Sequence, residues 1–369
     1  MKLTEITEGR TKLFVPKEEK LLKSNEVFYN PEMELSRDIS VAITNVLEPE
    51  TFCDLLAGSG ARGVRIANET NARVTINDLN PKACELAREN LNRNGVSADV
   101  RNSGANLLLA GARFDYIDID PFGPPVRFLD SAVRAVNSGG LLAVTATDTG
   151  ALCGTYLSAC QRKYDAVPLR TDYYNELGLR VLIASVARTA MRFGFGIKPL
   201  FSHCSAHYFR TYVQVLGRSA NVKGTLENIG YLQHCFGCMG RKYAKLGEIE
   251  SVCSCGERFR NAGPVWRGGF AEEDFCAKMK EELESGTFGK KKKALKLAGL
   301  VEKEQTANLP FYDVHKACKK LGASSTSMDG ILTGLKSGGF EAERTHFSGV
   351  GVRTDAGIDE LKKVIRIRK

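Results

Sequence analysis

The sequence predicts an α/β fold, in which an open, mostly parallel sheet ends in an antiparallel hairpin and is followed by a C-terminal α+β domain. Short apolar runs alternate with helical stretches up to about residue 216, which is typical of a sheet with helices on both faces. A glycine-rich turn follows the first apolar run. The extended runs 197–204 and 207–216 have too short a connection for a crossover, so they should pair antiparallel. Because 369 residues exceed one small core, we expect two domains, 1–220 and 221–369.

The apolar and helical segments before the hairpin follow one another in a regular order. The predicted strands cover 51–56, 73–78, 97–101, 114–119 and 141–147, and the predicted helices cover 62–69, 81–94, 125–136 and 180–193. Pro81 in a first helical turn and Gly95 just beyond the last turn delimit the second of these helices. The carboxyl ends of the parallel strands should then meet at one edge, where open α/β sheets bind ligands.

The composition is that of a globular protein, and we expect the protein to be cytoplasmic. Hydrophobic residues make up 43% of the chain, and no apolar run approaches the roughly 20 residues that span a bilayer. The first twenty residues are charged throughout and contain no apolar signal core. Most of the eleven cysteines are scattered among apolar residues, as small buried side chains are in a reducing compartment.

Basic residues outnumber acidic ones, with a formal net charge of +9, which is compatible with a polyanionic partner. They cluster at 290–293, with Lys296 close by, and at the chain end, 366–369. Each cluster has two interpretations. It is either a solvated loop or frayed end, or a set of contacts to phosphate groups.

The glycine-rich turn indicates a nucleotide-type cofactor. Gly58, Gly60 and Gly63 have the G-x-G-x-x-G spacing between a predicted strand and a helix, which lets the backbone approach a ligand closely. Asp78 ends the next strand, where a carboxylate can accept hydrogen bonds from ribose hydroxyls. Asp54 precedes the glycines, where its charge would attract the cationic methionine end of S-adenosylmethionine and repel a pyrophosphate. We therefore favour S-adenosylmethionine over a nicotinamide cofactor.

A second motif closes the fourth strand, beginning at Asp120-Pro121-Phe122-Gly123. It resembles the D/N-P-P-Y/F signature of amino-group methyltransferases. An exocyclic amine on a base is a poor nucleophile, and acceptors that bind its N–H groups orient it for methyl transfer. Asp120 supplies a carboxylate, the Pro121 carbonyl can supply a second acceptor, and Phe122 offers a face for a flipped base. Together with the antiparallel strand at the sheet's end, the motif predicts a class I methyltransferase.

More extensive similarity comes from segments outside these two motifs. Segments 28–38, 145–154, 263–268 and 344–347, together with the Asp-Pro-Phe-Gly motif, look like the tRNA (guanine-26-N2)-dimethyltransferase family, in family order over nearly the whole chain. The resemblance implies transfer of one or two methyl groups from S-adenosylmethionine to N2 of the guanine between the D arm and the anticodon stem. It also implies that this base is extruded into the pocket.

The resemblance further implies roles for individual residues in the substrate pocket. Asp120 would be the catalytic carboxylate, and Asp148 would neighbour it in the pocket. Phe28 would help to enclose the active site.

Other residues would line the cofactor site. Arg37 would contact the cofactor carboxylate, while Arg62 or Arg65, and Asp78, would line the same site.

The loop after the third strand departs from the family pattern. Family members usually carry an acidic residue there that holds the adenine amino group. In this chain the loop 102–106 has no acid. Ser103 or a backbone carbonyl must replace this acid as the group that holds the adenine amino group. Ala105 is the other residue of this loop that we expect at the cofactor site.

Four cysteines form a separate cluster in the second domain. Cys235 and Cys238 have C-x2-C spacing, and Cys253 and Cys255 follow after fourteen residues, which fits a structural zinc site with four thiolates. The second pair is C-x-C, which departs from the usual spacing. Free or redox-active thiols are the alternative, and His234 could replace one ligand.

Other functions share part of these features. A DNA or rRNA amino-methyltransferase would share the cofactor loop and the fourth-strand motif but not the C-terminal motifs. A zinc-containing RNA-binding protein with a vestigial methyltransferase fold is a non-enzymatic alternative, although intact Asp54, Asp78 and Asp120 argue against it. A nicotinamide-dependent oxidoreductase is the least favoured. We expect a monomer whose C-terminal domain grips the tRNA, with the lysine run, Arg344 and the basic end as candidate phosphate contacts.

Overall fold

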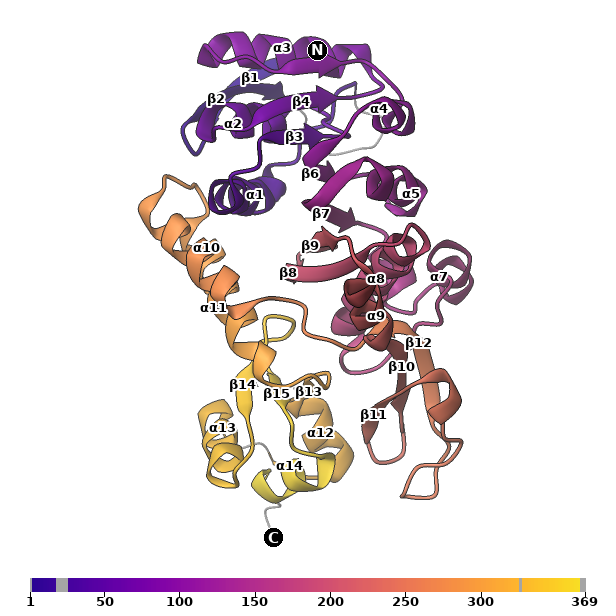
Figure 1. Cartoon of the computed structure of the whole chain (residues 1–369). Helices are drawn as coiled ribbons and strands as arrows, with labels where there is room; N and C mark the ends of the chain where they lie inside the picture. Colours follow the sequence, from indigo (N-terminus) through magenta and orange to yellow (C-terminus); the bar gives the residue numbers. More distant parts are fainter. Residues whose placement is uncertain (1, 18–25, 325–326, 366–369) are drawn as a thin grey trace.

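The computed structural model describes residues 2–17, 26–324 and 327–365, and their chain folds around one seven-stranded sheet and three smaller ones. In Figure 1 the large sheet and its helices form the upper part, and the C-terminal segment forms a separate module at the bottom. Among the described residues no helix is long and apolar enough to cross a membrane.

The large sheet has the strand order β5-β4-β3-β6-β7-β9-β8. Its strands are β3 (Thr51–Asp54), β4 (Arg73–Asn77), β5 (Asp99–Arg101), β6 (Phe114–Ile119), β7 (Val136–Ala146), β8 (Gly196–Ser205) and β9 (Tyr208–Leu216). The first five pair in parallel, and β9 lies antiparallel between β7 and β8. The predicted parallel sheet with a terminal antiparallel hairpin is therefore confirmed.

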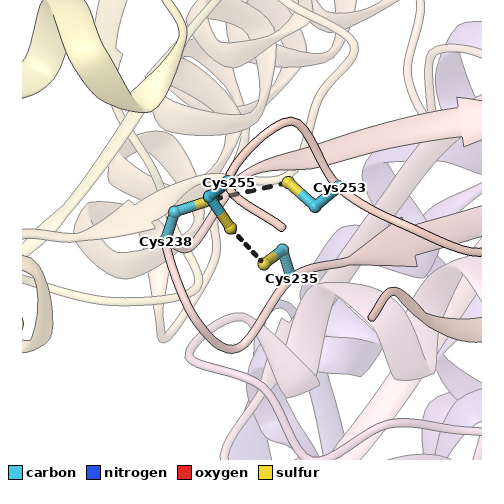
Figure 2. A group of neighbouring side chains, drawn as sticks. All are labelled: Cys235, Cys238, Cys253 and Cys255. Carbon is cyan, nitrogen blue, oxygen red and sulfur yellow. Dashed lines mark hydrogen bonds between the residues drawn. The ribbon is translucent and has the colours of Figure 1, made fainter. Parts of the chain in front are cut away.

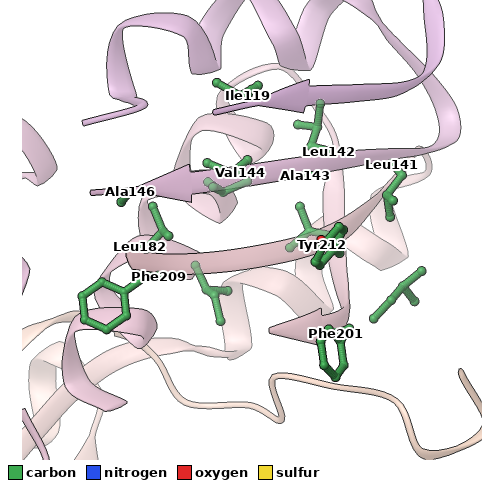
Figure 3. Packing of buried hydrophobic residues seen from close by; sticks show 14 of the residues in the cluster. Ile119, Leu141, Leu142, Ala143, Val144, Ala146, Leu182, Phe201, Phe209 and Tyr212 are labelled. Atoms are coloured by element: carbon green, nitrogen blue, oxygen red, sulfur yellow. The ribbon is translucent and has the colours of Figure 1, made fainter. Parts of the chain in front are cut away.

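Helices cover both faces of this sheet. They are α1 (Glu34–Leu47), α2 (Ala61–Glu69), α3 (Pro81–Asn94), α4 (Ala105–Gly111), α5 (Val126–Ala135), α6 (Thr149–Leu152), α7 (Leu157–Tyr164) and α8 (Tyr174–Arg192). The central strands are apolar on both faces because helices exclude water from each side. Figure 3 shows this at β7, where the buried Leu142 and Val144 share one face of the strand and the buried Leu141 lies on the other.

The N-terminal segment forms a hairpin that the sequence pattern did not reveal. Strands β1 (Leu3–Glu8) and β2 (Thr11–Pro16) pair antiparallel, and β2 lies against α3. The Asn90 side chain of α3 accepts a hydrogen bond from Phe14 N and donates one to Phe14 O. A short 3-10 turn, Pro31–Met33, then leads into α1.

The remaining residues form two three-stranded sheets and the helices between them. One sheet has the order β11-β10-β12, and the other has the order β13-β15-β14. The elements are α9 (Ser219–Glu227), β10 (Ile229–His234), β11 (Arg241–Ala244), β12 (Arg260–Trp266), α10 (Glu273–Ser285), α11 (Lys291–Lys303), β13 (Tyr312–Asp313), α12 (Val314–Leu321), α13 (Met328–Ser337), β14 (Ala342–Arg344), β15 (Gly351–Thr354) and α14 (Ile358–Val364). Short 3-10 turns lie at Leu246–Glu248 and Glu304–Thr306.

One continuous apolar core joins the large sheet to the elements that follow it. Residues of β12, α10 and α11, such as Val265, Met279 and Ala298, belong to the same buried cluster as the sheet strands. The segment from β13 to α14 has a smaller core of its own, including Tyr312, Ile331 and Leu361. The division into domains at residues 220 and 221 stays a prediction.

Three of the differences between the structure and the predicted elements concern helices. The predicted helix 125–136 ends at Ala135, and Val136 already pairs with Phe114 in β7. Helix α8 begins at Tyr174, six residues before the predicted start at Arg180, and its residues from Glu176 to Ala187 are buried. The lysine run opens α11 and is not a loop.

Candidate active site

The glycine-rich turn lies at the carboxyl edge of the large sheet, between β3 and α2. Gly58 and Gly60 both have positive φ, 55° and 75°. A Cβ at Gly58 would lie 2.9 Å from the carbonyl oxygen of Phe28, which itself accepts a hydrogen bond from Ser59 N. Asp78, just after β4, accepts the N–H of Gly58 at 2.8 Å through Oδ2. The turn is thus held from two sides, by Phe28 and by Asp78.

Asp54 lies beneath this turn and is almost completely buried. Its Oδ2 accepts the N–H of Gly63 at 2.8 Å, in the first turn of α2. Burial raises the pKa of Asp54 to about 7, the nearby Arg62 opposes this shift, and the Asp118 carboxylate adds to it. A positive charge brought close would favour the carboxylate form.

Asp120 follows β6 at the same edge and is held by an arginine. Its Oδ2 lies 2.5 Å from Nη2 of Arg62, and its side chain is 19% exposed. Arg62 also donates to the Ser40 hydroxyl at 2.6 Å, and its Nε lies 3.5 Å from Asp118. The Asp120 carboxylate therefore has a fixed orientation and an accessible side.

A buried ion pair lies directly behind Asp120, and sequence reasoning missed it. Arg210 of β9 pairs with Asp118 of β6 and also donates to Thr145 of β7. Both charged side chains have no exposed surface. The signal was present, since an arginine and an aspartate within apolar strands need a partner inside the protein.

Two aromatic rings flank the site. The rings of Phe28 and Phe122 meet edge to face with centroids 4.4 Å apart, and Phe122 remains 43% exposed. The loop that carries Phe122 is fixed to the end of β7. Gly123 N donates to the Thr147 hydroxyl, and Thr147 N donates to Gly123 O. The structure thus brings Phe28, which precedes α1, next to the Asp-Pro-Phe-Gly loop.

Asp148 follows β7 at the edge and occupies the N-cap position of α6, without a capping hydrogen bond from its side chain. It accepts hydrogen bonds from Lys163 Nζ at 3.0 Å and from the Tyr164 hydroxyl at 2.6 Å, both on α7. Its contacts among the described residues hold α7 against the site.

Arg37 and Arg65 lie in a buried network beside the cofactor turn. Arg37 forms a two-pronged contact with Glu8 and also donates to the carbonyl of Asn30. Arg65 has no exposed surface, and its guanidinium contacts Glu8, Asp38 and Glu69. Burial would raise the pKa of Glu8, but Arg37 and the other neighbours outweigh it and lower the pKa. In this structure Arg62 contacts Asp120 of the Asp-Pro-Phe-Gly loop, whereas the Arg65 guanidinium contacts Glu8, Asp38 and Glu69.

The loop after β5 borders the same site. Asn77 at the end of β4 donates to the carbonyls of Leu55 and Ser103. Asn102 donates to the backbone of Asp78, and Ala105 begins α4 and is largely buried. Ser103 and Ala105 therefore lie beside Asp78, and their contact with an adenine stays a prediction.

The four cysteines come together away from this site (Figure 2). Their sulfur atoms all lie within 4.8 Å of one another, with Cys235 and Cys255 at 3.4 Å and Cys238 and Cys253 at 3.6 Å. Four thiolates at 2.3 Å from one zinc ion are about 3.8 Å apart, so this arrangement fits a tetrahedral zinc site. His234 is not part of the group and instead packs against Tyr173 and Phe236.

The four cysteine thiols shift one another's pKa values. Burial would raise the pKa of Cys253, but hydrogen bonds from the Cys255 backbone and from the other thiols lower it to about 7. Burial raises the pKa of Cys238 to about 12. A bound metal ion would hold all four groups as thiolates, and no position would remain open for catalysis.

The predicted basic contacts are only partly accessible. Lys290 is engaged with Glu34 of α1 at 2.9 Å, whereas Lys292, Lys293 and Lys296 are exposed on α11. Arg344 pairs with Asp329 at 2.8 Å. The basic segment 366–369 lies outside the described residues.

The sheet order, the glycine turn after β3 and the Asp-Pro-Phe-Gly loop after β6 define a class I methyltransferase. Residues 9–366 match the family model described as N2,N2-dimethylguanosine tRNA methyltransferase. The chain therefore belongs to the N2,N2-dimethylguanosine tRNA methyltransferase family.

Relatives of this family cover the chain almost completely. A tRNA (guanine(26)-N(2))-dimethyltransferase of Methanosarcina acetivorans is 42% identical over 98% of both chains. One from Methanobrevibacter smithii is 40% identical over 99% of this chain and 97% of its own. The solved structure of Trm1 from Pyrococcus horikoshii, a complex with S-adenosyl-L-methionine, has a TM-score of 0.88 and 35% identity, covering 99% of this chain and all of that one.

Proposed function

We propose that this protein transfers methyl groups from S-adenosylmethionine to the exocyclic N2 of guanine 26 in tRNA, giving mono- and dimethylguanosine. The observation that carries the proposal is the position of Asp120. It lies at the carboxyl edge of the sheet, next to the cofactor turn, with one oxygen on Arg62 and a partly exposed carboxylate. Phe122, two residues further along the same loop, contacts Phe28. The relatives named above are guanine-26 enzymes over nearly the full chain length.

S-Adenosylmethionine would supply an electrophilic methyl group on a sulfonium. We propose that Gly58, Gly60 and Asp78 hold its nucleoside part, with Ser103 and Ala105 beside the adenine. Asp54 and Arg62 would line the methionine end, and Arg37 would contact its carboxylate. Arg65 would act by fixing Glu8 and Arg37, since its own guanidinium is enclosed.

The protein's own groups act on the nucleophile. The guanine amino group is conjugated with its ring, so its lone pair is weakly available. The Asp120 carboxylate and the Pro121 carbonyl would accept its two N–H bonds and direct the lone pair at the methyl group. For each transfer the nitrogen would gain the methyl group, the sulfonium would become a neutral thioether, and Asp120 would take the proton that the nitrogen loses and pass it to solvent. Phe122 and Phe28 would stack on the extruded base, with Asp148 bordering the pocket.

Several finer points belong to the same proposal. Four thiolates would hold one structural zinc ion in the β10–β12 sheet. The second domain, beyond residue 220, would bind the tRNA body. We infer that the protein acts as a monomer in the cytoplasm, where its tRNA substrate is.

The test is transfer of labelled methyl to unmodified tRNA transcripts with guanine or adenine at position 26. We expect label on the guanine transcript and none on the adenine transcript. Asp120→Asn, which preserves shape and removes the charge, should lower kcat by about 10²- to 10³-fold. It should leave S-adenosylmethionine binding intact. Equal labelling of both transcripts would refute the position, and full activity of the variant would refute the role of Asp120.

A further inference from the structure

Tyr208 is a buried tyrosine at the edge of the active site. It is the first residue of β9, and only 4% of its surface is exposed. Its hydroxyl is buried and has no hydrogen-bond partner within the described residues. A buried hydroxyl without a partner is costly, so such a group commonly has a function.

The strand register places Tyr208 on the face of the sheet that carries Asp120. Thr145 of β7 pairs with Arg210, and Ala146 pairs with Phe209, so Tyr208 lies beside Thr147. Residues two apart share a face of a strand. Tyr208 therefore lies on the same side as Arg210, whose guanidinium reaches Asp118 of β6.

The same register brings the tyrosine close to the catalytic loop. Asp120 is two residues beyond Asp118 and shares its face, and both contact Arg62. Tyr208 is one step nearer the open edge than Arg210, at the level of the loop that Thr147 holds. The Asp120 carboxylate is near enough to contribute to the raised pKa of Tyr208.

The surroundings leave the Tyr208 proton available to a ligand. Burial raises the pKa of Tyr208, with a further contribution from Tyr212, so the phenol stays protonated at neutral pH. The residue opposite it on β8, Ser205, lies near the phenol oxygen and opposes part of this rise in pKa, while its own hydroxyl is joined to His203 Nδ1 at 2.8 Å. A phenol in this state is a hydrogen-bond donor.

We propose that the Tyr208 hydroxyl donates a hydrogen bond to O6 of the guanine in the active site, and so helps to select guanine. The inference rests on the proposed function. The groups expected at the amino edge, Asp120 and the Pro121 carbonyl, are acceptors and match only N–H groups. Guanine also carries an oxygen acceptor, and a site that satisfies it rejects bases that lack it.

The test compares Tyr208→Phe with the wild type on two transcripts that carry guanine or 2-aminopurine at position 26. 2-Aminopurine keeps the amino group and lacks O6. We expect Tyr208→Phe to lower kcat/KM on the guanine transcript by about tenfold or more, which corresponds to loss of one buried hydrogen bond. On the 2-aminopurine transcript the variant should match the wild type, because the acceptor is already absent.

Tyr116→Phe is the matched control, because Tyr116 has another buried, unpartnered hydroxyl, deeper on the same face. It should affect both transcripts equally or not at all. An equal loss on both transcripts with Tyr208→Phe would overturn the proposal in favour of a structural role, and so would unchanged activity. If the wild type labels neither the guanine transcript nor any other tRNA, the proposed function itself fails.

Discussion

The buried carboxylates at the ends of the central strands differ in how fully arginine side chains compensate their charge. Asp54, Asp118 and Asp120 all lie near Arg62, and Arg210 neutralises Asp118 from the other side. Removing a charge from water is expensive unless a partner compensates for it. Asp118 is compensated by two arginines, and Asp120 remains partly exposed. Within the described part of the chain, the direct partner of the Asp54 carboxylate is a backbone N–H, that of Gly63. The two less compensated carboxylates are those that we assign to ligands.

The elevated pKa of Asp54 predicts a pH-dependent affinity for S-adenosylmethionine. In the free protein Asp54 has a pKa of about 7 and is therefore largely neutral at pH 6. A cationic ligand binds the carboxylate form better, so the Kd should fall by about tenfold between pH 6 and pH 8. Calorimetry at several pH values measures this. Asp54→Asn keeps an oxygen acceptor for Gly63 and should remove the dependence; an identical pH profile in the variant would exclude Asp54 as the cause.

The raised pKa of Asp54 makes the folded protein less stable as the pH rises, whereas it makes cofactor binding tighter. The folded state keeps a proton on Asp54 that the unfolded chain releases above the ordinary aspartate pKa of 3.8. The stabilisation from this group is therefore complete below that pH and is lost as the pH rises through about 7.

Site residues that follow a recognisable motif could be predicted from the sequence, whereas pairs of residues that meet only in the folded chain could not. Asp120 and Asp78 follow strands whose ends are visible in the sequence. Arg210 and Asp118 are separated by 92 positions, and no local pattern indicates that they pair. The same is true of Tyr208, whose importance depends on the register between β7 and β9.

At the scale of elements, the cofactor turn depends on close backbone approach. Gly58→Ala would place a methyl group 2.9 Å from the Phe28 carbonyl in a left-handed conformation. We expect the Kd for S-adenosylmethionine to rise at least about tenfold, because the turn must move away from Phe28. Gly95→Ala is the control, since it has a similar φ of 64° and nothing within 4 Å. Both variants should lose about 1 kcal/mol of stability, and a Kd that changes equally in both would contradict the steric argument.

A zinc ion held by the four cysteines would make the β10–β12 sheet dependent on metal. We expect purified protein to contain about one zinc per chain, measured by elemental analysis. Cys238→Ser should lose the metal and lower the unfolding temperature by roughly 5 °C or more. Cys84→Ser is the control, because the Cys84 thiol only donates to the carbonyls of Asp78 and Arg101. Metal-free wild-type protein of unchanged stability would show that the thiols serve another purpose.

The elements predicted best are those whose ends carry local signals. Helix α3 has the predicted bounds, with Asn80 capping its start and Gly95 in the left-handed conformation at its end. The β1–β2 hairpin was missed because its partner, α3, lies far along the chain. Val136 was assigned to a helix because its β-strand partner, Phe114, cannot be identified from the local pattern.

At the scale of the whole molecule, buried ion pairs connect the C-terminal module to the large sheet. Arg353 of β15 contacts Glu176 of α8 and Glu304, and none of the three has exposed surface. His346 contacts Glu304 through Nδ1 and accepts the N–H of Cys204 of β8 through Nε2. These directional contacts fix the module relative to the strand that neighbours β9. A tRNA held by the module is thereby held at a set position relative to Asp120.

The charge of α11 gives the last prediction, which concerns how the whole molecule binds tRNA. Lys292 and Lys293 are exposed on the helix that connects the large sheet with the C-terminal module (Figure 1). If both contact phosphates, Lys292→Ala with Lys293→Ala should weaken tRNA binding at low salt. The slope of log K against log salt concentration should become less steep by about 1.5, as expected for two lost contacts. Lys319→Ala with Lys320→Ala on α12 removes the same charge from another exposed pair and should leave the slope unchanged.

Equal slopes for both double variants would mean that tRNA responds to net charge alone. A change confined to the α12 pair would place the phosphate contacts on α12 instead of on α11.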